Sequence, residues 1–300
     1  MRILRFADLD TLSRAAADQL AMVVSTVPRK LVAAPVAEPR RARGGRRSAT
    51  GGSATTLGSP RRGTTDNDAI GDGSAARVVT NLRGTVLSNG GPCHIALSGG
   101  STPKRLFQIL VERGPRFIPW QRVHLWWCDE RCVAPDHPDS NYGMTYKHLV
   151  EPLGLDPTHV HRMLGESDPD TAASDYERAL TQTLGDPPAF DLLLLGMGSD
   201  GHTASLFPES PATRETARYV VANRVDSPLT HGPTTRLTLT YPAINAAKRV
   251  RFLVSGSDKA EALAAVVEGP QGKYPAQHVA GADVAWFVDD AAAAKLGGNR

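Results

Sequence analysis

The stretch FDLLLLGMGSDGHTASLFP, residues 190–208, carries the strongest structural signal in this chain of 300 residues. An apolar run over residues 190–195 leads directly into three glycines, an aspartate and a histidine. A short apolar run bounded by glycine is typical of a strand that is buried on both faces. Three glycines in one loop cost conformational entropy, which is expected where the backbone approaches a ligand closely. The stretch therefore predicts a buried strand that ends at a ligand-binding loop.

The same arrangement recurs on both sides of this stretch from Ser74 onward, as a short apolar run, a polar or glycine-rich exit and an amphipathic helix pattern. Strands that are apolar on both faces and alternate with helices favour a mostly parallel sheet with helices on both faces. The sequence thus predicts an α/β protein with a doubly wound, Rossmann-like sheet. The expected strands are Cys93–Leu97, Val123–Cys128, Phe190–Leu195, Tyr219–Val225, Val250–Val254 and Val284–Phe287.

Composition divides the chain into three parts. Residues 1–27 place Leu12, Ala16, Leu20 and Val23 at helical spacing, which predicts an N-terminal helix of the α/β domain. Residues 28–72 are rich in Arg, Gly, Ser, Thr and Pro and have too few apolar residues to offset their ordering entropy, so we expect a disordered insertion. Residues 73–300 form the expected α/β catalytic domain.

Charge and cysteine content restrict the class of protein. Residues 29–63 contain nine Lys or Arg and one acid, so they contribute +8 to the net charge of +3 and leave −5 for the rest. The apolar runs are far shorter than the roughly 20 residues of a membrane-spanning helix, and no basic-then-apolar leader opens the chain. Three cysteines, Cys93, Cys128 and Cys132, are an odd number, which argues against a disulfide framework. These features predict a cytoplasmic protein without a membrane partner.

Four of the expected strands run into polar segments. Open α/β sheets bind ligands outside the carboxyl ends of their strands, so these segments are predicted to meet in one crevice. The segments are Ser98–Pro103, Asp129–Arg131, Gly196–His202 and Ser255–Lys259.

The first segment has the composition of an anion-binding loop. It consists of Ser98, Gly99, Gly100, Ser101 and Thr102 and is followed by a proline suited to the first turn of a helix. Such a loop can direct backbone N–H groups and hydroxyls toward a phosphate at the positive end of that helix. A plain turn between strand and helix is the alternative, but the strand before it and the apolar helix pattern after it favour phosphate binding. The loop matches neither a Walker loop nor a GxGxxG fingerprint.

Basic residues in the other segments are suited to an anionic substrate. Arg131 lies in the triplet that begins with Asp129, and a guanidinium binds oxygen atoms bidentately. Lys259 opens a helix pattern beside the expected crevice, and Arg236 is a weaker candidate of the same kind. A solvated cluster of charges is the alternative for the triplet, and surface charge is the alternative for the lysine. The four-residue offset of Cys128 and Cys132 without a second cysteine pair argues against a metal site.

His202 is the predicted general base. A single histidine is more often structural than catalytic, but this one lies in a glycine-rich loop at a strand end, two residues from Asp200. An imidazole titrates near neutral pH and can take a proton from water, a role typically worth about 10²- to 10⁴-fold in rate.

The four motifs together resemble one family. SGGSTP at 98–103, DER at 129–131, GMGSDGHTASLFP at 196–208 and SGSDKAEAL at 255–263 are, in this order, similar to the glucosamine-6-phosphate deaminase/6-phosphogluconolactonase family, and within it to the lactonases. The similarity runs from about residue 75 to the C-terminus and is weaker over residues 1–27. Residues 28–72 depart from the family pattern, away from every motif.

The resemblance implies hydrolysis of 6-phospho-D-glucono-1,5-lactone to 6-phosphogluconate in the pentose phosphate pathway, without metal or cofactor. By this likeness His202 is the general base and Asp200 orients it. The loop over residues 98–102, Asp129, Arg131, Gly198, Arg236 and Lys259 would contact the substrate. The expected partner is a small sugar-phosphate lactone, and the oligomeric state stays open.

Two other functions compete with this interpretation. A sugar-phosphate deaminase or isomerase of the same fold would use Asp129 to move a proton, but relatives of that type resemble GHIAFNEP and carry a glutamate where this chain has Phe207. A nucleic-acid or anionic-surface binder would instead use the arginine cluster within residues 28–72. That segment lacks interleaved aromatic residues, which argues against specific nucleic-acid binding. Deletion of residues 28–72 separates the hydrolase from the binder. A hydrolase should keep its lactonase activity without this segment, whereas a binder should lose its function.

Overall fold

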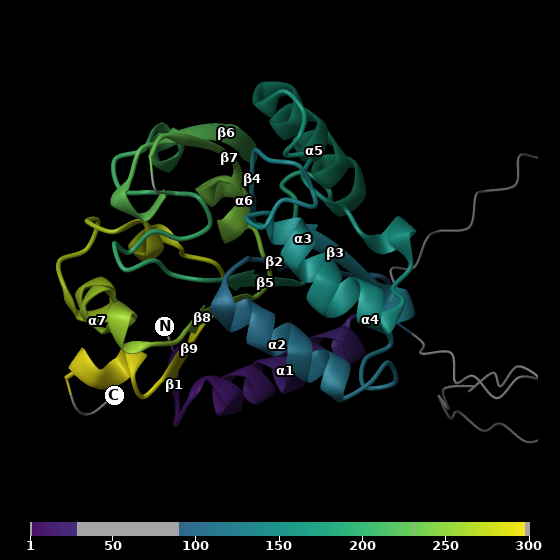
Figure 1. Ribbon diagram of the computed structural model, residues 1–300, viewed down its shortest axis with the longest axis horizontal. Helices are drawn as coiled ribbons and strands as arrows, with labels where there is room; N and C mark the ends of the chain where they lie inside the picture. The colour runs from purple at the N-terminus through teal and green to yellow at the C-terminus, as the bar shows by residue number, and fades with distance from the viewer. Residues whose placement is uncertain (1, 29–89, 231, 298–300) are drawn as a thin grey trace, which may run out of the picture. The chain divides into compact units, whose positions relative to one another are not determined.

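Six parallel strands in the order β1-β9-β8-β5-β2-β3 form the central sheet of the computed structural model, which describes residues 2–28, 90–230 and 232–297 (Figure 1). Every residue of β2, β5 and β8 is buried, as expected for strands that are covered on both faces. The predicted α/β architecture with a mostly parallel sheet is confirmed. The six strands are β1 Arg2–Phe6, β2 Cys93–Leu97, β3 Val123–Trp127, β5 Leu192–Leu195, β8 Val250–Val254 and β9 Val284–Asp289.

Strand order explains where a site can form. The strands β8, β5, β2 and β3 are consecutive neighbours in the sheet, and all of their pairings are parallel. Their carboxyl ends therefore lie along one stretch of the same sheet edge. These are the four strands that run into the polar segments.

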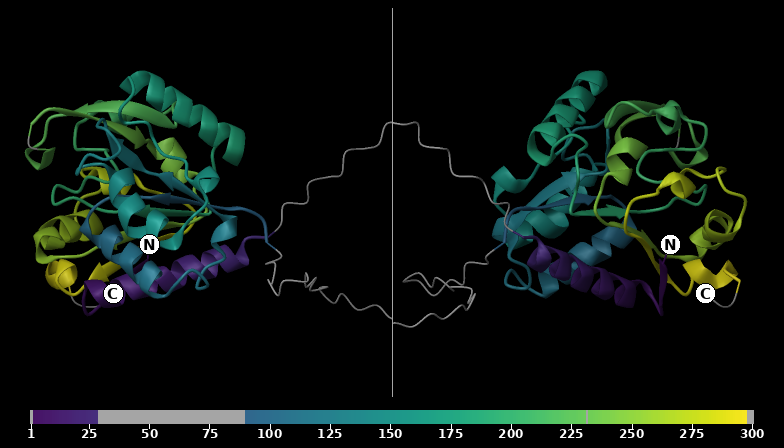
Figure 2. Two further views of the ribbon diagram at one scale, coloured as in Figure 1. Left: turned by 45° about the vertical axis from the view of Figure 1, so that its right-hand side comes forward. Right: turned by 180° about the vertical axis from the view of Figure 1, so that it is seen from behind.

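Helices cover the sheet from two sides. The N-terminal helix α1 (Leu9–Thr26) begins with a capping box between Asp8 and Thr11 and buries Leu12, Leu20 and other apolar residues of one face. It lies side by side with α2 (Ser101–Glu112), as Figure 1 shows. Helix α5 (Pro169–Leu184) lies on the opposite side of the molecule from α1 and α2 (Figure 2).

The remaining helices are short. They are α3 Asn141–Thr145, the π-helix Tyr146–Val150, α4 Glu151–Leu153, α6 Tyr241–Asn245, α7 Ala260–Glu268 and the 3₁₀ helices Trp120–Arg122, Pro157–His159, Pro211–Arg214, Pro228–Thr230, Ser257–Lys259, Pro275–His278 and Ala292–Lys295. Within the three described ranges no helix is both long enough and apolar enough to span a bilayer.

A second sheet differs from the sequence prediction. The strands β4 (Asp129–Arg131), β7 (Thr234–Leu239) and β6 (Val220–Val225) form a three-stranded antiparallel sheet. The prediction that the run Tyr219–Val225 belongs to the main sheet is therefore wrong. Burial along β6 is interrupted by half-buried and exposed residues instead of being continuous, so the strand is less covered than the central strands of the main sheet.

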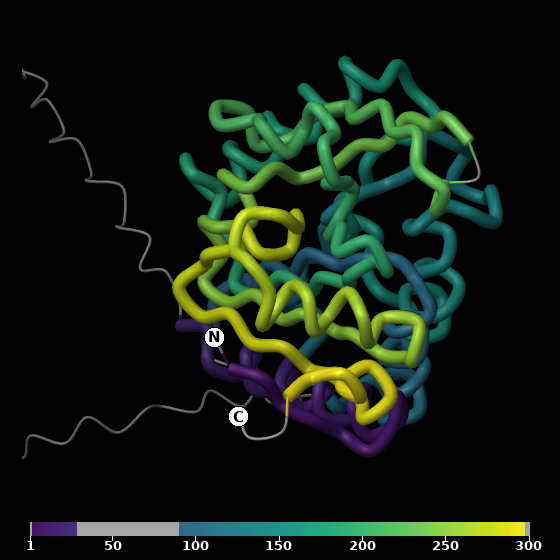
Figure 3. The backbone as a smooth tube through the Cα atoms, turned by 90° about the vertical axis from the view of Figure 1, so that its left-hand side faces the viewer, coloured from purple at the N-terminus to yellow at the C-terminus, as the bar shows by residue number. Residues whose placement is uncertain are grey.

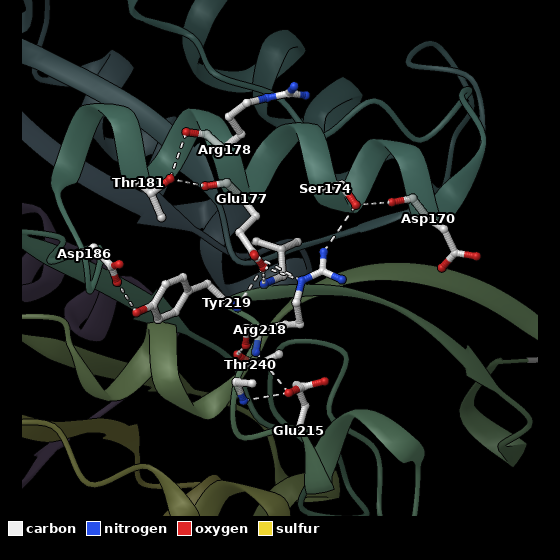
Figure 4. Close-up of polar contacts among 12 residues, drawn as sticks. Asp170, Ser174, Glu177, Arg178, Thr181, Asp186, Glu215, Arg218, Tyr219 and Thr240 are labelled. Carbon is white, nitrogen blue, oxygen red and sulfur yellow. Dashed lines mark hydrogen bonds and ion pairs between the residues drawn. The ribbon is translucent and has the colours of Figure 1, made fainter.

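Glu177 of α5 holds this small sheet against the helix. Its carboxylate accepts hydrogen bonds from the backbone N–H groups of Tyr219 at 2.8 Å and Val220 at 2.9 Å (Figure 4). It also accepts from Nε of Arg218 at 3.1 Å. The start of β6 is thus tied to α5 by a single side chain.

The N-terminal segment also differs from its prediction. Residues 1–27 are not only helical, because β1 precedes α1 and pairs in parallel with β9 at the edge of the main sheet (Figure 3). Three of the five β1 residues are exposed and two are arginines, so the segment lacks the apolar run that identified the other strands. Apart from Pro28, the expected disordered insertion over residues 28–72 lies outside the described residues, and the division of the chain into three parts stays a prediction.

Four histidine rings lie together where β2 and β3 meet the segment after α4, and they belong to His94, His124, His159 and His161. Nδ1 of His124 lies 3.0 Å from Nε2 of His161. The His161 ring stacks on Trp126 with ring centroids 4.0 Å apart, and the His124 ring lies 4.2 Å from that of His159. Burial, followed by the neighbouring His124 and His159 rings, lowers the pKa of His161 to about 4. Burial, with His159 as the next cause, also lowers the pKa of His124.

Acid should destabilise the fold through this cluster. Because the folded-state pKa of His161 is depressed, its stabilising contribution is present above pH 6.5, the ordinary value, and is lost as the pH falls toward about 4. We expect the free energy of unfolding to fall by on the order of 2 kcal/mol through this residue. His161→Phe keeps a ring against Trp126 but cannot titrate, so urea denaturation between pH 7 and pH 4.5 should show a smaller fall for the variant. An equal fall in both proteins would contradict this assignment.

Candidate active site

Side chains from the ends of the four neighbouring strands line a cavity of about 280 Å³. Antiparallel pairing with β4 brings β7, and with it Arg236, to the same place. Asp200 does not line this cavity but bonds to a residue that does. The lining includes all other residues predicted from the sequence, which are Ser98, Gly99, Gly100, Ser101, Thr102, Asp129, Arg131, Gly198, His202, Arg236 and Lys259.

The His202 ring is held from three directions. Its Nδ1 atom lies 2.6 Å from Oδ1 of Asp200, which also accepts a hydrogen bond from the His202 backbone N–H at 3.0 Å. One ring face stacks on Phe207 with centroids 4.1 Å apart. A Cβ atom on Gly198 would lie 2.1 Å from Nδ1, so the ring packs directly against this glycine. The side chain is 19% exposed, which fits an imidazole that lines a cavity without being free to rotate.

Asp200 is maintained as a carboxylate. Burial acts to raise its pKa, but the hydrogen bond and charge of the His202 ring and the bond from the His202 amide outweigh burial and lower it. An ionised Asp200 accepts a hydrogen bond from Nδ1–H and so selects the tautomer in which Nε2 of His202 is the basic nitrogen.

The loop after β2 places its backbone, more than its side chains, at the cavity. Gly100 has a φ of 106° and is the N-cap of α2, a conformation that favours glycine. A Cβ atom on Gly99 would lie 1.8 Å from Oδ1 of Asn141, so this position is also restricted to glycine. The Ser98 hydroxyl donates to the carbonyl of Leu194 at 2.9 Å and thereby ties the loop to β5.

Arg131 and Arg236 lie directly opposite each other on β4 and β7. The Nε atoms of both are buried without a hydrogen-bond partner in the part of the chain that the structure describes. Burial and the adjacent Arg131 charge lower the pKa of Arg236. Like charges directly opposite each other on neighbouring strands are destabilising, so the pair is suited to an anion placed between or above the two guanidinium groups.

Lys259 approaches the cavity from the loop that follows β8. Its Nζ lies 2.9 Å from Oδ2 of Asp258, which also lines the cavity. The buried carboxylate of Asp289 accepts hydrogen bonds from the Ser255 hydroxyl and the Gly256 amide, and so holds the loop that leads to this lysine. Unlike the two arginines, Lys259 already has a carboxylate partner.

Asp129 is part of a buried polar network that the sequence did not reveal. Its Oδ2 accepts from the Ser205 hydroxyl at 2.7 Å, and its Oδ1 accepts from Nδ2 of Asn141 at 3.2 Å. Asn141 lies outside every motif that the sequence singled out, and Ser205 lies within the glycine-rich stretch 196–208 but 76 residues from Asp129, so no local pattern marks the two contacts. Asn141 itself lines the cavity.

The cysteines near the site are unpaired thiols. Cys128 and Cys132 form no disulfide, and burial raises the pKa of both thiols, which disfavours the thiolate form that binds metal. Among residues 2–28, 90–230 and 232–297, no group of three or more His, Cys, Asp or Glu side chains is arranged to hold a metal ion.

A parallel α/β sheet with a His–Asp pair and clustered basic groups at its carboxyl edge defines the chain as an α/β enzyme. The family described as glucosamine-6-phosphate isomerases/6-phosphogluconolactonase matches residues 65–286. The chain therefore belongs to this family. A 6-phosphogluconolactonase from Synechocystis is 38% identical over 227 residues, which cover 73% of this chain and 90% of the relative.

Solved structures agree with this assignment. The crystal structure of a 6-phosphogluconolactonase from Thermotoga maritima is 30% identical, with a TM-score of 0.58, and the match covers 66% of this chain and 85% of that one. A monomeric glucosamine-6-phosphate deaminase has a TM-score of 0.66 at 20% identity, with 98% of this chain and 100% of that one covered. This second likeness shows the fold alone.

Gly198→Ala should break the His202–Asp200 pair. The added Cβ would lie 2.1 Å from Nδ1 of His202 and 2.7 Å from Oδ1 of Asp200, so both side chains have to move. We expect the free energy of unfolding to fall by about 1 to 3 kcal/mol, and the downfield proton resonance of the Nδ1–H···Oδ1 bond to disappear. Gly196→Ala is the matched control, because its Cβ would meet nothing within 4 Å. An unchanged resonance in Gly198→Ala would mean that the glycine does not constrain the pair.

Proposed function

We propose that the chain hydrolyses 6-phospho-D-glucono-1,5-lactone to 6-phosphogluconate, a step of the pentose phosphate pathway, and acts in the cytoplasm on this small sugar phosphate. The observation that carries the proposal is that His202, whose Nδ1 lies 2.6 Å from Asp200, lines the same cavity as two arginines whose Nε atoms have no partner among the described residues. Lactone opening needs an activated water, donors for a developing oxyanion and an anchor for the distant phosphate. A relative at 38% identity that is named as a lactonase gives independent support.

The proposed base is Nε2 of His202. Asp200 accepts a hydrogen bond from Nδ1–H, so the other ring nitrogen is free to take a proton from water as the oxygen of that water attacks the lactone carbonyl. Backbone N–H groups of Gly99 and Gly100, which line the cavity, would donate to the oxyanion. When the bond to the ring oxygen breaks, the protonated His202 returns its proton to that oxygen. The base is then neutral again for the next cycle.

The proposed phosphate anchor is the pair Arg131 and Arg236. A phosphate dianion neutralises both guanidinium groups and supplies acceptors for buried N–H groups that otherwise have none. Lys259 is already paired with Asp258, so it is better suited to contact a sugar oxygen or to exchange partners when substrate binds. The anchor places the carbonyl carbon near the base without contributing to the chemistry itself.

His202→Ala should lower kcat by at least roughly 10²-fold, because it removes the group that accepts the proton of water. The assay follows lactone hydrolysis corrected for spontaneous opening. Asp200→Asn should cause a smaller loss, because the ring remains but its tautomer is no longer selected. A rate for His202→Ala equal to that of the unmodified protein would refute the assigned base.

Arg236→Ala should weaken substrate binding more than it slows the chemical step. Loss of a hydrogen-bonded charge contact costs about 1.5 to 3 kcal/mol, so we expect KM to rise roughly 10- to 100-fold with a much smaller change in kcat. Arg224→Ala is a suitable control because it removes an exposed arginine of the adjacent strand that does not line the cavity. A normal KM in Arg236→Ala would remove this arginine from the anchor.

A deaminase of the same fold is the competing function, and the position of Asp129 in the cavity is the observation in its favour. Both carboxylate oxygens of Asp129 already accept hydrogen bonds from Ser205 and Asn141. Phe207 occupies the position of the deaminase glutamate and stacks on the His202 ring. Release of ammonia from glucosamine 6-phosphate at a rate comparable to lactone hydrolysis would favour the deaminase.

A further inference from the structure

Glu130 is a buried carboxylate between two residues of the cavity, and the proposed chemistry gives it no role. Its side chain points away from Asp129 and Arg131 into the protein, where only 2% of the residue is exposed. It accepts hydrogen bonds from the backbone N–H groups of Arg131, Asn141 and Tyr142, each at 2.7 Å, and from the Ser140 hydroxyl at 3.0 Å. Among the described residues none forms an ion pair with it.

The bonds from Ser140, Asn141 and Tyr142 close the loop over residues 132–140 onto the strand that carries Arg131. With the loop closed, the carbonyl of Asp139 accepts a hydrogen bond from Nη1 of Arg131. The guanidinium is therefore oriented by a backbone atom whose own position depends on Glu130. The Arg131 guanidinium is thus held in place through Nη1, while its Nε–H still lacks a hydrogen-bond acceptor among the described residues.

The same closure places Asn141. Its Nδ2 donates to the carbonyl of Asp129 at 2.9 Å, and its Oδ1 packs against Gly99 of the loop after β2. Glu130 thus joins two walls of the cavity that come from different strands, β4 and the end of β2.

The chemistry of the contacts requires a carboxylate. All four partners are donors, and an ionised carboxylate only accepts, whereas a glutamine amide would present an N–H₂ group to at least one backbone N–H. Burial raises the pKa of Glu130, and the bonds from Tyr142, Asn141, Arg131 and Ser140 act in the opposite direction. The ionised form of Glu130 is therefore stabilised by hydrogen bonds from three backbone N–H groups and one hydroxyl, and not by an ion pair with a basic side chain of the described residues.

We propose that Glu130 is a positioning residue for substrate binding: it holds the Asp139 carbonyl in place, and through that carbonyl it sets Arg131 for the phosphate group. This inference rests on the proposed phosphate anchor. Its role is to lower KM through Arg131, and it does not touch substrate.

A double-mutant cycle between Glu130 and Arg131 tests this role. The four proteins are the unmodified chain, Glu130→Gln, Arg131→Ala and the double variant, each assayed for kcat and KM with 6-phosphogluconolactone and for Tm. We expect Glu130→Gln to raise KM about tenfold with kcat changed less than about threefold. On the Arg131→Ala background the same substitution should leave KM within about twofold, because the group that it positions is absent.

Two further variants separate positioning from general stability. Ser140→Ala removes one of the four bonds and should raise KM about threefold, an increase that also disappears on the Arg131→Ala background; it serves if Glu130→Gln does not fold. Glu177→Gln is the matched control, since this carboxylate also accepts two backbone N–H bonds but docks α5 on β6 (Figure 4). It should lower Tm and leave KM unchanged.

The outcomes distinguish the two proposals. A KM increase of equal size on both backgrounds, or a fall in kcat with normal KM, would overturn the positioning role while leaving the anchor intact. A normal KM in Arg131→Ala alone would overturn the phosphate anchor, and the inference about Glu130 with it. A KM increase in Glu177→Gln as large as that in Glu130→Gln would show that loss of stability alone explains the effect.

Discussion

Parallel pairing of β8, β5, β2 and β3 is the constraint on which the rest of the structure depends. Parallel neighbours must all end at the same edge, so four loops that are far apart in the sequence are brought within reach of one small molecule. The pairing is stabilised by burial on both faces, and every residue of β2, β5 and β8 is buried. A stable core and a cavity at its edge are thus two results of the same arrangement.

The small antiparallel sheet adds what the parallel sheet cannot supply. Pairing of β4 with β7 sets Arg131 opposite Arg236, a juxtaposition that is unfavourable until an anion is present. Glu130 closes the loop behind one of these arginines, and Glu177 ties β6 to α5. The proposed positioning of Arg131 thus rests on a buried polar contact outside the cavity, whereas the Glu177 contacts hold the small sheet against the helix.

The four polar segments were predictable because each follows a strand with an unmistakable apolar pattern. Gly198, His202 and Lys259 could be named from that pattern, and all three line the cavity. The edge strand β1 was not predicted, since exposure at an edge removes the apolar run on which strand prediction depends. The run that forms β6 was recognised as a strand but assigned to the main sheet, because an apolar run does not reveal which strand it pairs with. Asn141 of α3 and Ser205 of the glycine-rich stretch were missed for a different reason, because a small polar residue has no signal of its own until its partner in space is known.

The amino-acid sequence by itself determined the order of buried strands, the loops that end them and the residue types available for chemistry. It could do so because burial and turn formation depend on neighbours along the chain. Only the tertiary structure decided that Asp200 bonds Nδ1 of His202, that two arginines share one site and that Glu130 faces three amides. The juxtaposition of the two arginines depends on strand order and register, which are set by packing between distant segments, and the other two contacts depend on how the segments after β5 and β4 fold.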